Sequence, residues 1–316
     1  MPFFSIIVPL YNKADSIAAT LDSVFHQTCD DYELIIINDG STDHSEKIVQ
    51  QYADKRIKYY TTSNQGVSKT RNLGIEKASG TLIAFLDADD FWYPNHLEIL
   101  SKLYQTYPEA GIFATSYEKR YSPTAIFPAN FKNIDSTGKT FQLVEDFFHS
   151  NIIDAIIWTS ACAVPKKVLD NIGVFDTTIT HGAGEDTDLW IRIALAHEVA
   201  LATFITATYH LDATNRISKT DTLKRKFLDF EKFKQEEINN ISLKKYLDQN
   251  RYAISLLYKA AGDHKTARKY KDGIDLRNLS AKQKILLYSP KNLYLFIRSI
   301  KNKILLNTGI KLSAFE

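Results

Sequence analysis

Three aspartates, Asp87, Asp89 and Asp90, stand within four residues directly after the apolar run 82–86. Carboxylates this close repel one another unless a cation lies between them. A divalent cation carrying a phosphate-bearing ligand would meet that need, because hard cations bind carboxylate oxygens and complete their coordination with phosphate and water. The competing interpretation is that Asp89 or Asp90 only caps the helix predicted to start near Pro94. Capping needs one aspartate rather than three, so the pattern favours a ligand site.

The aspartates follow a predicted strand that belongs to an alternating series of strands and helices. Residues 82–86 lack in-out alternation, which predicts a strand buried on both faces of a sheet. Similar runs come earlier, at residues 3–8, 32–37 and 57–60, and segments with helical spacing separate them. This alternation predicts a mostly parallel sheet with right-handed crossovers. Ligands bind at the carboxyl edge of such a sheet. That edge would bring together Pro9–Tyr11, Asn38–Asp39 and Asp87–Asp89.

The pattern continues less regularly to about residue 220 and then becomes helical. We expect a helix at 94–107, a strand at 111–114, an irregular segment at 119–140, a strand at 158–164, a short helix at 165–171 and a helix from Glu185. From about Thr222 the spacing is helical, with breaks near Gly262, Asp272-Gly273 and Pro290. Residues 224–316 hold 21 Lys and Arg against 9 Asp and Glu, whereas residues 1–223 hold 18 against 28. We therefore expect two units, 1–220 and 221–316.

Composition excludes several classes of protein. A chain of 316 residues with 44% apolar content can bury one large core or two modest ones. Two cysteines in apolar surroundings, Cys29 and Cys162, indicate reduced thiols rather than a disulfide framework. The first twelve residues lack the features of a signal peptide, and no apolar run reaches the roughly 18–20 residues that span a bilayer. We expect a cytoplasmic protein without a nucleic-acid partner.

Five segments resemble the motifs of family 2 glycosyltransferases. They are SIIVPLYN at 5–12, NDGSTD at 38–43, NQGVSKTRNLGIEKASG at 64–80, FLDADD at 85–90 and GEDTDLWIR at 184–192. Five motifs in the expected order, over roughly the first 220 residues, are far more specific than any one of them. The C-terminal third matches no motif. The resemblance implies an α/β protein of the GT-A fold, with a mixed, mostly parallel sheet, that acts as an inverting, metal-dependent enzyme on nucleotide-activated sugars. It places the nucleotide-sugar on residues 1–118 and the acceptor on residues 119–220.

The resemblance assigns the nucleotide to the ends of the first strands. Pro9 and Tyr11 would contact the base, with the tyrosine ring packed against it. Asp39 would accept a hydrogen bond from the base, as a carboxylate can from a uracil imide. Arg71 would lie near the nucleotide, and Asp87 would hold the ribose hydroxyls. As alternatives, Asp39 only shapes its turn and Arg71 is a solvated helix residue. UDP is favoured over other carriers through Tyr11 and Asp39 alone.

The resemblance also implies a metal ligand and a base. Asp89 would bind Mn²⁺ or Mg²⁺, and the ion would stabilise the charge on the departing nucleoside diphosphate. Inversion by direct displacement needs a base that takes the proton of the acceptor hydroxyl. Asp186 fits that role because its motif opens a helix after a Gly-rich loop. Glu185 is an alternative, as is Asp188, which can more simply pair with Arg192. The alternative without a catalytic role is that these acids only reflect the acidic enrichment common in a first helical turn.

Three residues of this region carry weaker signals. His210 follows a strand and could supply a further metal ligand, although a lone histidine is more often structural. Arg216 could meet the diphosphate on a closing loop, but the spacing of residues 208–218 departs from the family patterns. Trp190 could stack on a sugar ring, yet its spacing favours a place in the core.

The last stretch, residues 286–310, mixes apolar and basic side chains at helical spacing. Such a helix can lie on an anionic membrane face, and many members of the family act there on lipid-linked acceptors. Packing on the catalytic domain or on a dimer partner is an equal alternative. We expect a saccharide or lipid-linked acceptor, polysaccharide or cell-envelope synthesis as the setting, and a peripheral position on the inner face of the membrane.

Two other classes of function compete with a glycosyltransferase. A sugar nucleotidyltransferase would carry a Gly-rich, basic loop after the first strand, whereas residues 11–14 contain no glycine. A non-catalytic sugar-nucleotide sensor could keep the fold, but this chain has both a candidate metal ligand and a candidate base.

Overall fold

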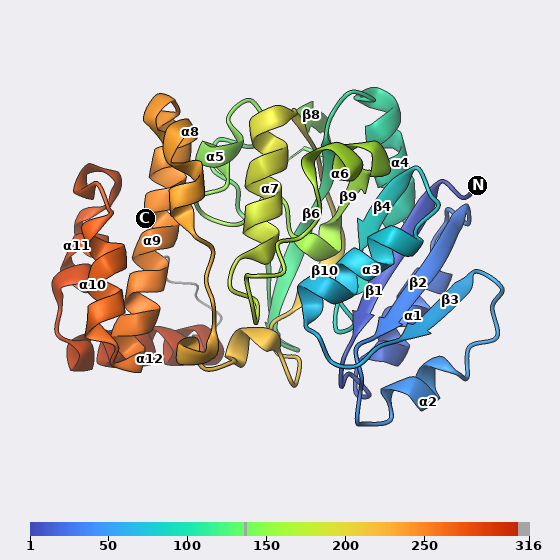
Figure 1. Ribbon diagram of the computed structural model, residues 1–316, viewed down its shortest axis with the longest axis horizontal. Helices are drawn as coiled ribbons and strands as arrows, with labels where there is room; N and C mark the ends of the chain where they lie inside the picture. Colours follow the sequence, from blue (N-terminus) through green and yellow to red (C-terminus); the bar gives the residue numbers. More distant parts are fainter. Residues whose placement is uncertain (136–137, 309–316) are drawn as a thin grey trace.

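Apolar runs without alternation form the parallel half of the sheet. The computed structural model describes residues 1–135 and 138–308 (Figure 1). The strands of this half are β1 (Phe4–Leu10), β2 (Tyr32–Asn38), β3 (Ile57–Thr61) and β4 (Leu82–Phe85). They lie in the order β3-β2-β1-β4, all parallel, with β1 between β2 and β4. The connecting helices are α1 (Ile17–Phe25), α2 (Ser45–Val49) and α3 (Val67–Lys77). All these elements agree with the prediction.

The second half of the sheet is mixed. Its strands are β5 (Phe91–Trp92), β6 (Ile112–Ser122), β7 (Ala125–Pro128), β8 (Phe141–Leu143), β9 (Cys162–Pro165) and β10 (Val199–His210). β9 pairs antiparallel with both β4 and β6, and β6 pairs in parallel with β10. β5, β7 and β8 add antiparallel edges. The helices of this part are α4 (His96–Thr106), α5 (Phe147–Ser150), α6 (Lys166–Ile172) and α7 (Glu185–Ala196).

The structure corrects three predictions in this half. Residues 119–128, expected to be irregular, are the end of β6 and its hairpin partner β7. The strand expected over 158–164 starts only at Cys162, after the 3-10 turn η1 (Thr159–Ala161). For β10 the sequence indicated only that a strand precedes His210, without its bounds, although this strand lies between β6 and β5. Its sequence, VALATFITATYH, is rich in alanine and threonine, and register shifts interrupt its pairing with β6 between Ala202 and Ala207. Both features weaken the apolar pattern that reveals a strand.

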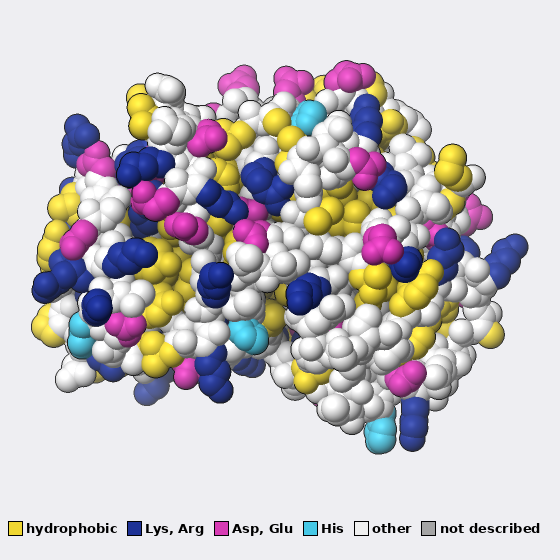
Figure 2. Space-filling model, viewed as in Figure 1, with side chains coloured by type: hydrophobic (Ala, Val, Ile, Leu, Met, Phe, Trp, Pro, Cys, Tyr) yellow, Lys and Arg dark blue, Asp and Glu magenta, His cyan; other side chains and the backbone are white. Residues whose placement is uncertain are grey.

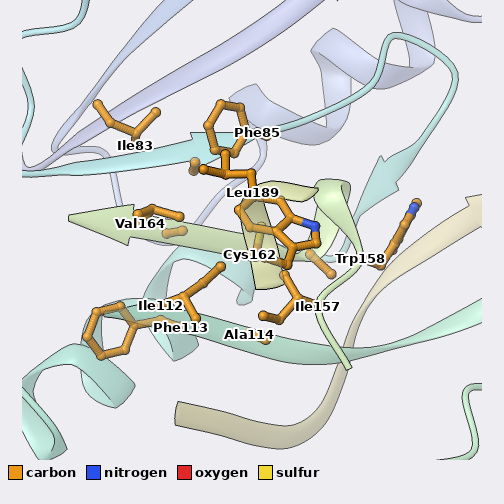
Figure 3. Packing of buried hydrophobic residues seen from close by; sticks show 14 of the residues in the cluster. Ile83, Phe85, Ile112, Phe113, Ala114, Ile157, Trp158, Cys162, Val164 and Leu189 are labelled. Atoms are coloured by element: carbon orange, nitrogen blue, oxygen red, sulfur yellow. The ribbon is translucent and has the colours of Figure 1, made fainter. Parts of the chain in front are cut away.

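A continuous core lies between the sheet and α7. Figure 3 shows Leu189 of α7 beside Phe85 of β4 and above Cys162 of β9. Trp190 is 4% exposed and its ring contacts those of Phe85 and Phe175, so it belongs to the core, as the sequence favoured. This packing fixes α7, and with it the first turn of the helix, against the carboxyl end of β4.

The C-terminal region is helical, as predicted. Its α-helices are α8 (Lys234–Asn239), α9 (Ile241–Ala261), α10 (His264–Asp272), α11 (Ala281–Tyr288) and α12 (Lys291–Thr308). The breaks fall at Gly262, Gly273 and Pro290, where they were expected. Leu243 and Leu247 of α9 join the core of the sheet. Within residues 1–135 and 138–308, none of the helices combines the length and the apolar character needed to cross a bilayer. Residues 309–310, the end of the predicted basic stretch, lie outside the described chain.

Candidate active site

The carboxyl ends of β1, β2 and β4 meet at one edge of the sheet, as the sequence predicted. There they open into a cavity of about 420 Å³. Eight of the ten predicted site residues line it: Pro9, Tyr11, Asp39, Arg71, Asp87, Asp89, Glu185 and Arg216. Asp186 and His210, also within the described chain, lie next to lining residues but do not line the cavity themselves. The strand-end prediction therefore located the cavity, and the long-range contacts below arrange its side chains.

A buried arginine joins the two acidic clusters. Arg71, 4% exposed, donates from Nη2 to Asp87 Oδ1 at 2.6 Å and lies with Nη1 3.6 Å from Glu185 Oε1. Its guanidinium also lies 5.3 Å from the ring centre of Phe175. The sequence alternative of a solvated Arg71 is therefore wrong. The arginine links the end of β4 to the first turn of α7, so one cation balances carboxylates from both segments.

Glu185 is an acid of the cavity whose pKa is strongly raised. It is 4% exposed, and its Oε2 has no hydrogen-bond partner among the described residues. Burial, followed by the charge of Asp186, raises the pKa of Glu185 to about 7, although Arg71 opposes the shift. A carboxyl group with such a pKa changes charge near neutral pH, and its free oxygen is open to a ligand.

Asp89 carries an ion pair that the sequence did not reveal. Its Oδ2 lies 2.6 Å from Nζ of Lys13, and both side chains are 13% exposed. Nζ of Lys13 also donates to the main-chain oxygens of Thr214 at 3.4 Å and Asn215 at 3.1 Å. Burial raises the pKa of Asp89, and the Lys13 ammonium opposes this shift. In the sequence, the only indication of a role for Lys13 is its position two residues after Tyr11, at an otherwise acidic edge of the predicted sheet.

Asp90 and His210 lie next to Asp89, the candidate metal ligand, and are held there by hydrogen bonds. Asp90 is 2% exposed and accepts hydrogen bonds from Ser160 Oγ at 2.6 Å and from the His210 amide at 3.2 Å. Burial and the charges of Asp89 and Asp87 raise its pKa well above the ordinary value. His210 Nδ1 lies 2.9 Å from the main-chain oxygen of Asp89.

Neither Asp89 nor Asp90 caps α4. The N-cap residue of α4 is Asn95, and its side chain makes no capping bond. The capping alternative considered for these aspartates is therefore wrong, and both side chains are committed to the edge of the sheet.

Asp39 holds a loop as well as facing the cavity. Its Oδ1 accepts from the Gln65 amide at 2.9 Å and from Thr62 Oγ1 at 3.2 Å, and its Oδ2 accepts from the Gly66 amide at 2.9 Å. Each carboxylate oxygen has two lone pairs, so Asp39 keeps acceptor capacity for a further donor. Tyr11 lies at the rim of the cavity with 41% exposure, which leaves its ring available for stacking.

The acids of α7 separate into two environments. Asp186 is half-buried, and its Oδ1 accepts from the Thr187 amide at 2.7 Å. Asp188 has a fully buried side chain that pairs with Arg192 at 3.0 Å, as predicted, and also with Lys232. Asp188 is therefore occupied by structural ion pairs, and Glu185 and Asp186 remain as candidates for a base.

The segment after β10 forms one wall of the cavity. Arg216 donates from Nη2 to Tyr209 Oη at 2.6 Å and lies 5.1 Å from the centre of that ring. The sequence indicated Arg216, but it missed Tyr209 and the neighbouring wall residues Asn215, Ile217, Ser218 and Thr220. No motif marks these positions, because they reach the cavity only through β10, whose bounds the sequence did not predict.

The residues at this edge fit a divalent ion held largely by its phosphate ligand. Among the described residues, no three His, Cys, Asp or Glu side chains converge on a metal position. Asp89 offers a carboxylate oxygen that already faces a cation. His210, if its Nδ1 carries the proton donated to the Asp89 carbonyl, offers Nε2, the arrangement usual for ligating histidines. One or two protein ligands suffice when diphosphate and water supply the others.

Comparison with protein families matches residues 5–172 to the model of glycosyl transferase family 2. An uncharacterized glycosyltransferase of Rickettsia bellii is 36% identical over 195 residues, which are 60% of this chain and 26% of the relative. Another, from Rickettsia prowazekii, is 28% identical over 260 residues, 75% of this chain and 74% of the relative. The matches to the relatives from R. bellii, R. felis and R. conorii cover only 26%, 31% and 30% of those proteins.

A solved structure shares the fold. The crystal structure of S. aureus TarS 1–349 in complex with UDP-GlcNAc aligns with a TM-score of 0.58 at 19% identity, over 85% of this chain and 90% of that one. The structure without ligand aligns with a TM-score of 0.56 at 18% identity. This likeness is one of fold, and it confirms the predicted GT-A class with its mixed sheet and helical C-terminal region.

Proposed function

The chain belongs to glycosyltransferase family 2, and from that premise we propose that it transfers a sugar from a nucleotide donor to an acceptor hydroxyl with inversion at the anomeric carbon. The observation that carries this proposal is one cavity lined both by the aspartates after β4 and by Glu185, which opens α7, with Arg71 between Asp87 and Glu185. A UDP-sugar is the first candidate donor, since TarS, which has a similar fold, has been crystallised with UDP-GlcNAc.

Residues of the strand ends would bind the donor. Tyr11 at the rim packs against the base, with Pro9 beside it, and Asp39 accepts a hydrogen bond from the base with its remaining lone pairs. Asp87 is 32% exposed at its side chain, so it can accept from ribose hydroxyls while it keeps its bond to Arg71. We assign the donor to residues 1–118 and the acceptor to residues 119–220. We take residues 221–316 as a basic helical unit, of which α9 packs on the core of the sheet.

The diphosphate end of the donor would lie toward Asp89 and Arg216. Asp89, with His210 as a second ligand, would hold Mn²⁺ or Mg²⁺, and a bound ion would stabilise negative charge on the leaving group. Arg216 lies on the opposite wall and can add charge-assisted hydrogen bonds to phosphate oxygens. These groups stabilise charge that grows as the sugar departs, and such stabilisation lowers the barrier.

The transfer itself is a single displacement. The acceptor oxygen forms a bond to the anomeric carbon while the bond from that carbon to the diphosphate oxygen breaks, and the nucleoside diphosphate leaves with the electron pair. The hydroxyl proton goes to a carboxylate. We assign this role to Asp186, at the first turn of α7 on the acceptor side. Glu185 is the alternative, since it lines the cavity and has a pKa of about 7.

Nucleotide release from UDP-, GDP- and dTDP-sugars, with Mn²⁺ or Mg²⁺ and with chelator, tests the proposal. We expect slow, metal-dependent release from one donor, lost in Asp89→Ala and in Asp186→Asn. Asp170→Asn is the matched control, because the side chain of Asp170 on α6 is 61% exposed and outside the cavity. Loss in Asp89→Ala but not in Asp186→Asn would move the base to Glu185. Metal-dependent nucleotide binding without release, even with candidate acceptors, would favour a sensor and contradict the proposal.

We further propose that α12 docks on an anionic membrane, as suits a lipid-linked acceptor and a place on the inner face of the cell membrane. Leu293, Phe296, Ile297 and Ile300 form a stripe at helical spacing, yet they are 46%, 63%, 37% and 42% exposed. Residues 276–315 contain eight Lys and Arg and no acid. Figure 2 shows Lys and Arg side chains among hydrophobic ones over the C-terminal helices at the left. An apolar stripe flanked by cations matches the interface of an anionic bilayer.

Sedimentation with vesicles tests the docking. We expect binding to phosphatidylglycerol vesicles, weaker binding to phosphatidylcholine, and loss of binding on deletion of residues 285–316. Phe296→Asp should weaken binding more than Ser299→Asp, which adds the same charge to the same helix outside the stripe. Equal sedimentation of the full chain and the deletion variant would exclude the membrane and favour a protein partner for this face.

A further inference from the structure

One lysine joins three parts of the cavity. Lys13 follows β1, and its ammonium contacts Asp89 Oδ2 at 2.6 Å and the main-chain oxygens of Thr214 and Asn215 at 3.4 and 3.1 Å. The side chains of Lys13 and Asp89 are each 13% exposed, so their ion pair is made largely away from water. The ammonium thus has acceptors from the segment after β4 and from the segment after β10, and it holds the two together.

The segment after β10, residues 211–220, has further ties to the end of β1. Asn215 Nδ2 donates to the main-chain oxygen of Asn12 at 3.0 Å, and Thr214 Oγ1 donates to Asp15 Oδ2 at 3.1 Å. Most residues of this segment are exposed, and its backbone forms only short 3-10 turns. Segments with few buried contacts open at low free energy. Among the described residues, Lys13 is the only cation that bonds residues 211–220 to the end of β1.

Two cations compete for Asp89. A divalent ion bound to Asp89 would stand within a few ångströms of the Lys13 ammonium, where like charges repel by several kcal/mol at an effective dielectric constant of about 20. The carboxylate can therefore serve one of them at a time. A displaced lysine also loses its place between the carbonyls of Thr214 and Asn215, because the ammonium bonds Asp89 and these oxygens from one position.

We propose that Lys13 is the resident counter-cation of Asp89, that a divalent ion must displace it, and that this displacement releases residues 211–220 from the end of β1. The inference rests on the proposed function, since it takes Asp89 to be the metal ligand. It gives Lys13 a positioning role: its flexible, point-charge ammonium balances the charge of Asp89 and holds residues 211–220 against the end of β1. Once displaced, it is free to meet the phosphate oxygens of the donor.

Binding of Mn²⁺ without nucleotide, followed at pH 8 by the electron paramagnetic resonance of the free ion, tests the competition. We expect Lys13→Met to bind Mn²⁺ about ten-fold more tightly than the wild type, because it removes one charged hydrogen bond that the ion must break. Lys13→Arg keeps the cation and should stay as weak as the wild type. Lys102→Met is the matched control, since Lys102 pairs with Glu98 on the exposed face of α4. Asp89→Ala should abolish binding.

Hydrogen exchange of residues 211–220 supplies the second readout. We expect faster exchange there in Lys13→Met without metal, and in the wild type only once Mn²⁺ is added. Unchanged or weaker Mn²⁺ affinity in Lys13→Met would overturn the proposal that Lys13 and the ion compete for Asp89. Unchanged hydrogen exchange would overturn the proposal that Lys13 holds residues 211–220 to the end of β1. If neither protein binds Mn²⁺ while the wild type still releases nucleotide from a sugar donor, this inference fails and the proposed function stands. If no donor is turned over but Lys13→Met binds Mn²⁺ more tightly than the wild type, the proposed function fails and this inference stands.

Discussion

Replacing Arg71 by methionine should destabilise the protein strongly, because the change leaves two carboxylates without their shared cation. Arg71 is 4% exposed, and its partners Asp87 and Glu185 have side chains that are 32% and 6% exposed. Removing one partner of a buried ion pair costs about 3–5 kcal/mol of the free energy of unfolding. We expect about 3 kcal/mol at pH 8, near the lower limit, because Asp87 can gain water and Glu185 can take up a proton.

The two carboxylates should contribute unequally to that loss. The pKa of Glu185 is about 7 even with Arg71 present, which lowers it, so in Arg71→Met protonation of Glu185 at pH 8 costs at most about 1.4 kcal/mol. Adding Glu185→Gln to Arg71→Met should therefore recover about 1 kcal/mol at pH 8. Adding Asp87→Asn to Arg71→Met should recover less than about 0.5 kcal/mol, because water can solvate an exposed carboxylate that has lost its ion-pair partner.

Urea denaturation followed by circular dichroism gives these free energies by linear extrapolation. The four proteins, namely the wild type, Arg71→Met and its two double variants, are measured at pH 8 and at pH 6. The advantage of the Glu185→Gln variant should shrink at pH 6, where Glu185 is neutral in either background. A loss below about 1 kcal/mol in Arg71→Met, or a larger recovery with Asp87→Asn than with Glu185→Gln, would refute the reasoning.

Three further outcomes are expected in the same assay. The folded pKa of Glu185, about 7, lies above its ordinary 4.5, so its contribution to the free energy of unfolding is present below pH 4.5 and is lost as pH rises to 7. In Glu185→Gln, the fall of the free energy of unfolding between pH 4.5 and pH 7 should be smaller by about 3 kcal/mol. Gly80→Ala should cost about 2 kcal/mol or more, because its Cβ would lie 2.7 Å from the backbone of Phe4, whereas Gly138→Ala, with only an ordinary contact of 3.4 Å, should cost little. Asp90→Asn should cost less than about 1 kcal/mol, because burial raises the pKa of Asp90 well above its ordinary value and thereby disfavours its charged form; a loss of about 3 kcal/mol would contradict this expectation.

The sequence sufficed to locate the cavity. Uninterrupted apolar runs predicted β1, β2 and β4, and glycines and polar turns marked where each ends. Since parallel strands place their carboxyl ends at one edge, residues 9–11, 39 and 87–89 had to converge, and they do. The breaks between the C-terminal helices were equally predictable, because Gly262 and Pro290 act on the local backbone.

The sequence did not determine which charges pair across the cavity. Lys13 meets Asp89, and Arg71 meets Glu185, between segments far apart in the chain. No local pattern encodes such pairs, because they depend on where the segment after β10 and the first turn of α7 pack. The bounds of β10 escaped prediction because its alanines and threonines give a weak apolar signal, and its burial comes from β6, β5 and the core.

The sequence by itself therefore determined the alternating fold, the edge of the sheet that carries the cavity and most of the side chains that reach it, since strand periodicity and strand ends are local properties. Only the tertiary structure decided how those side chains are paired, which of them are free and what their pKa values are. Burial and the distance between charges set these properties, and both arise from contacts between segments that the sequence keeps apart.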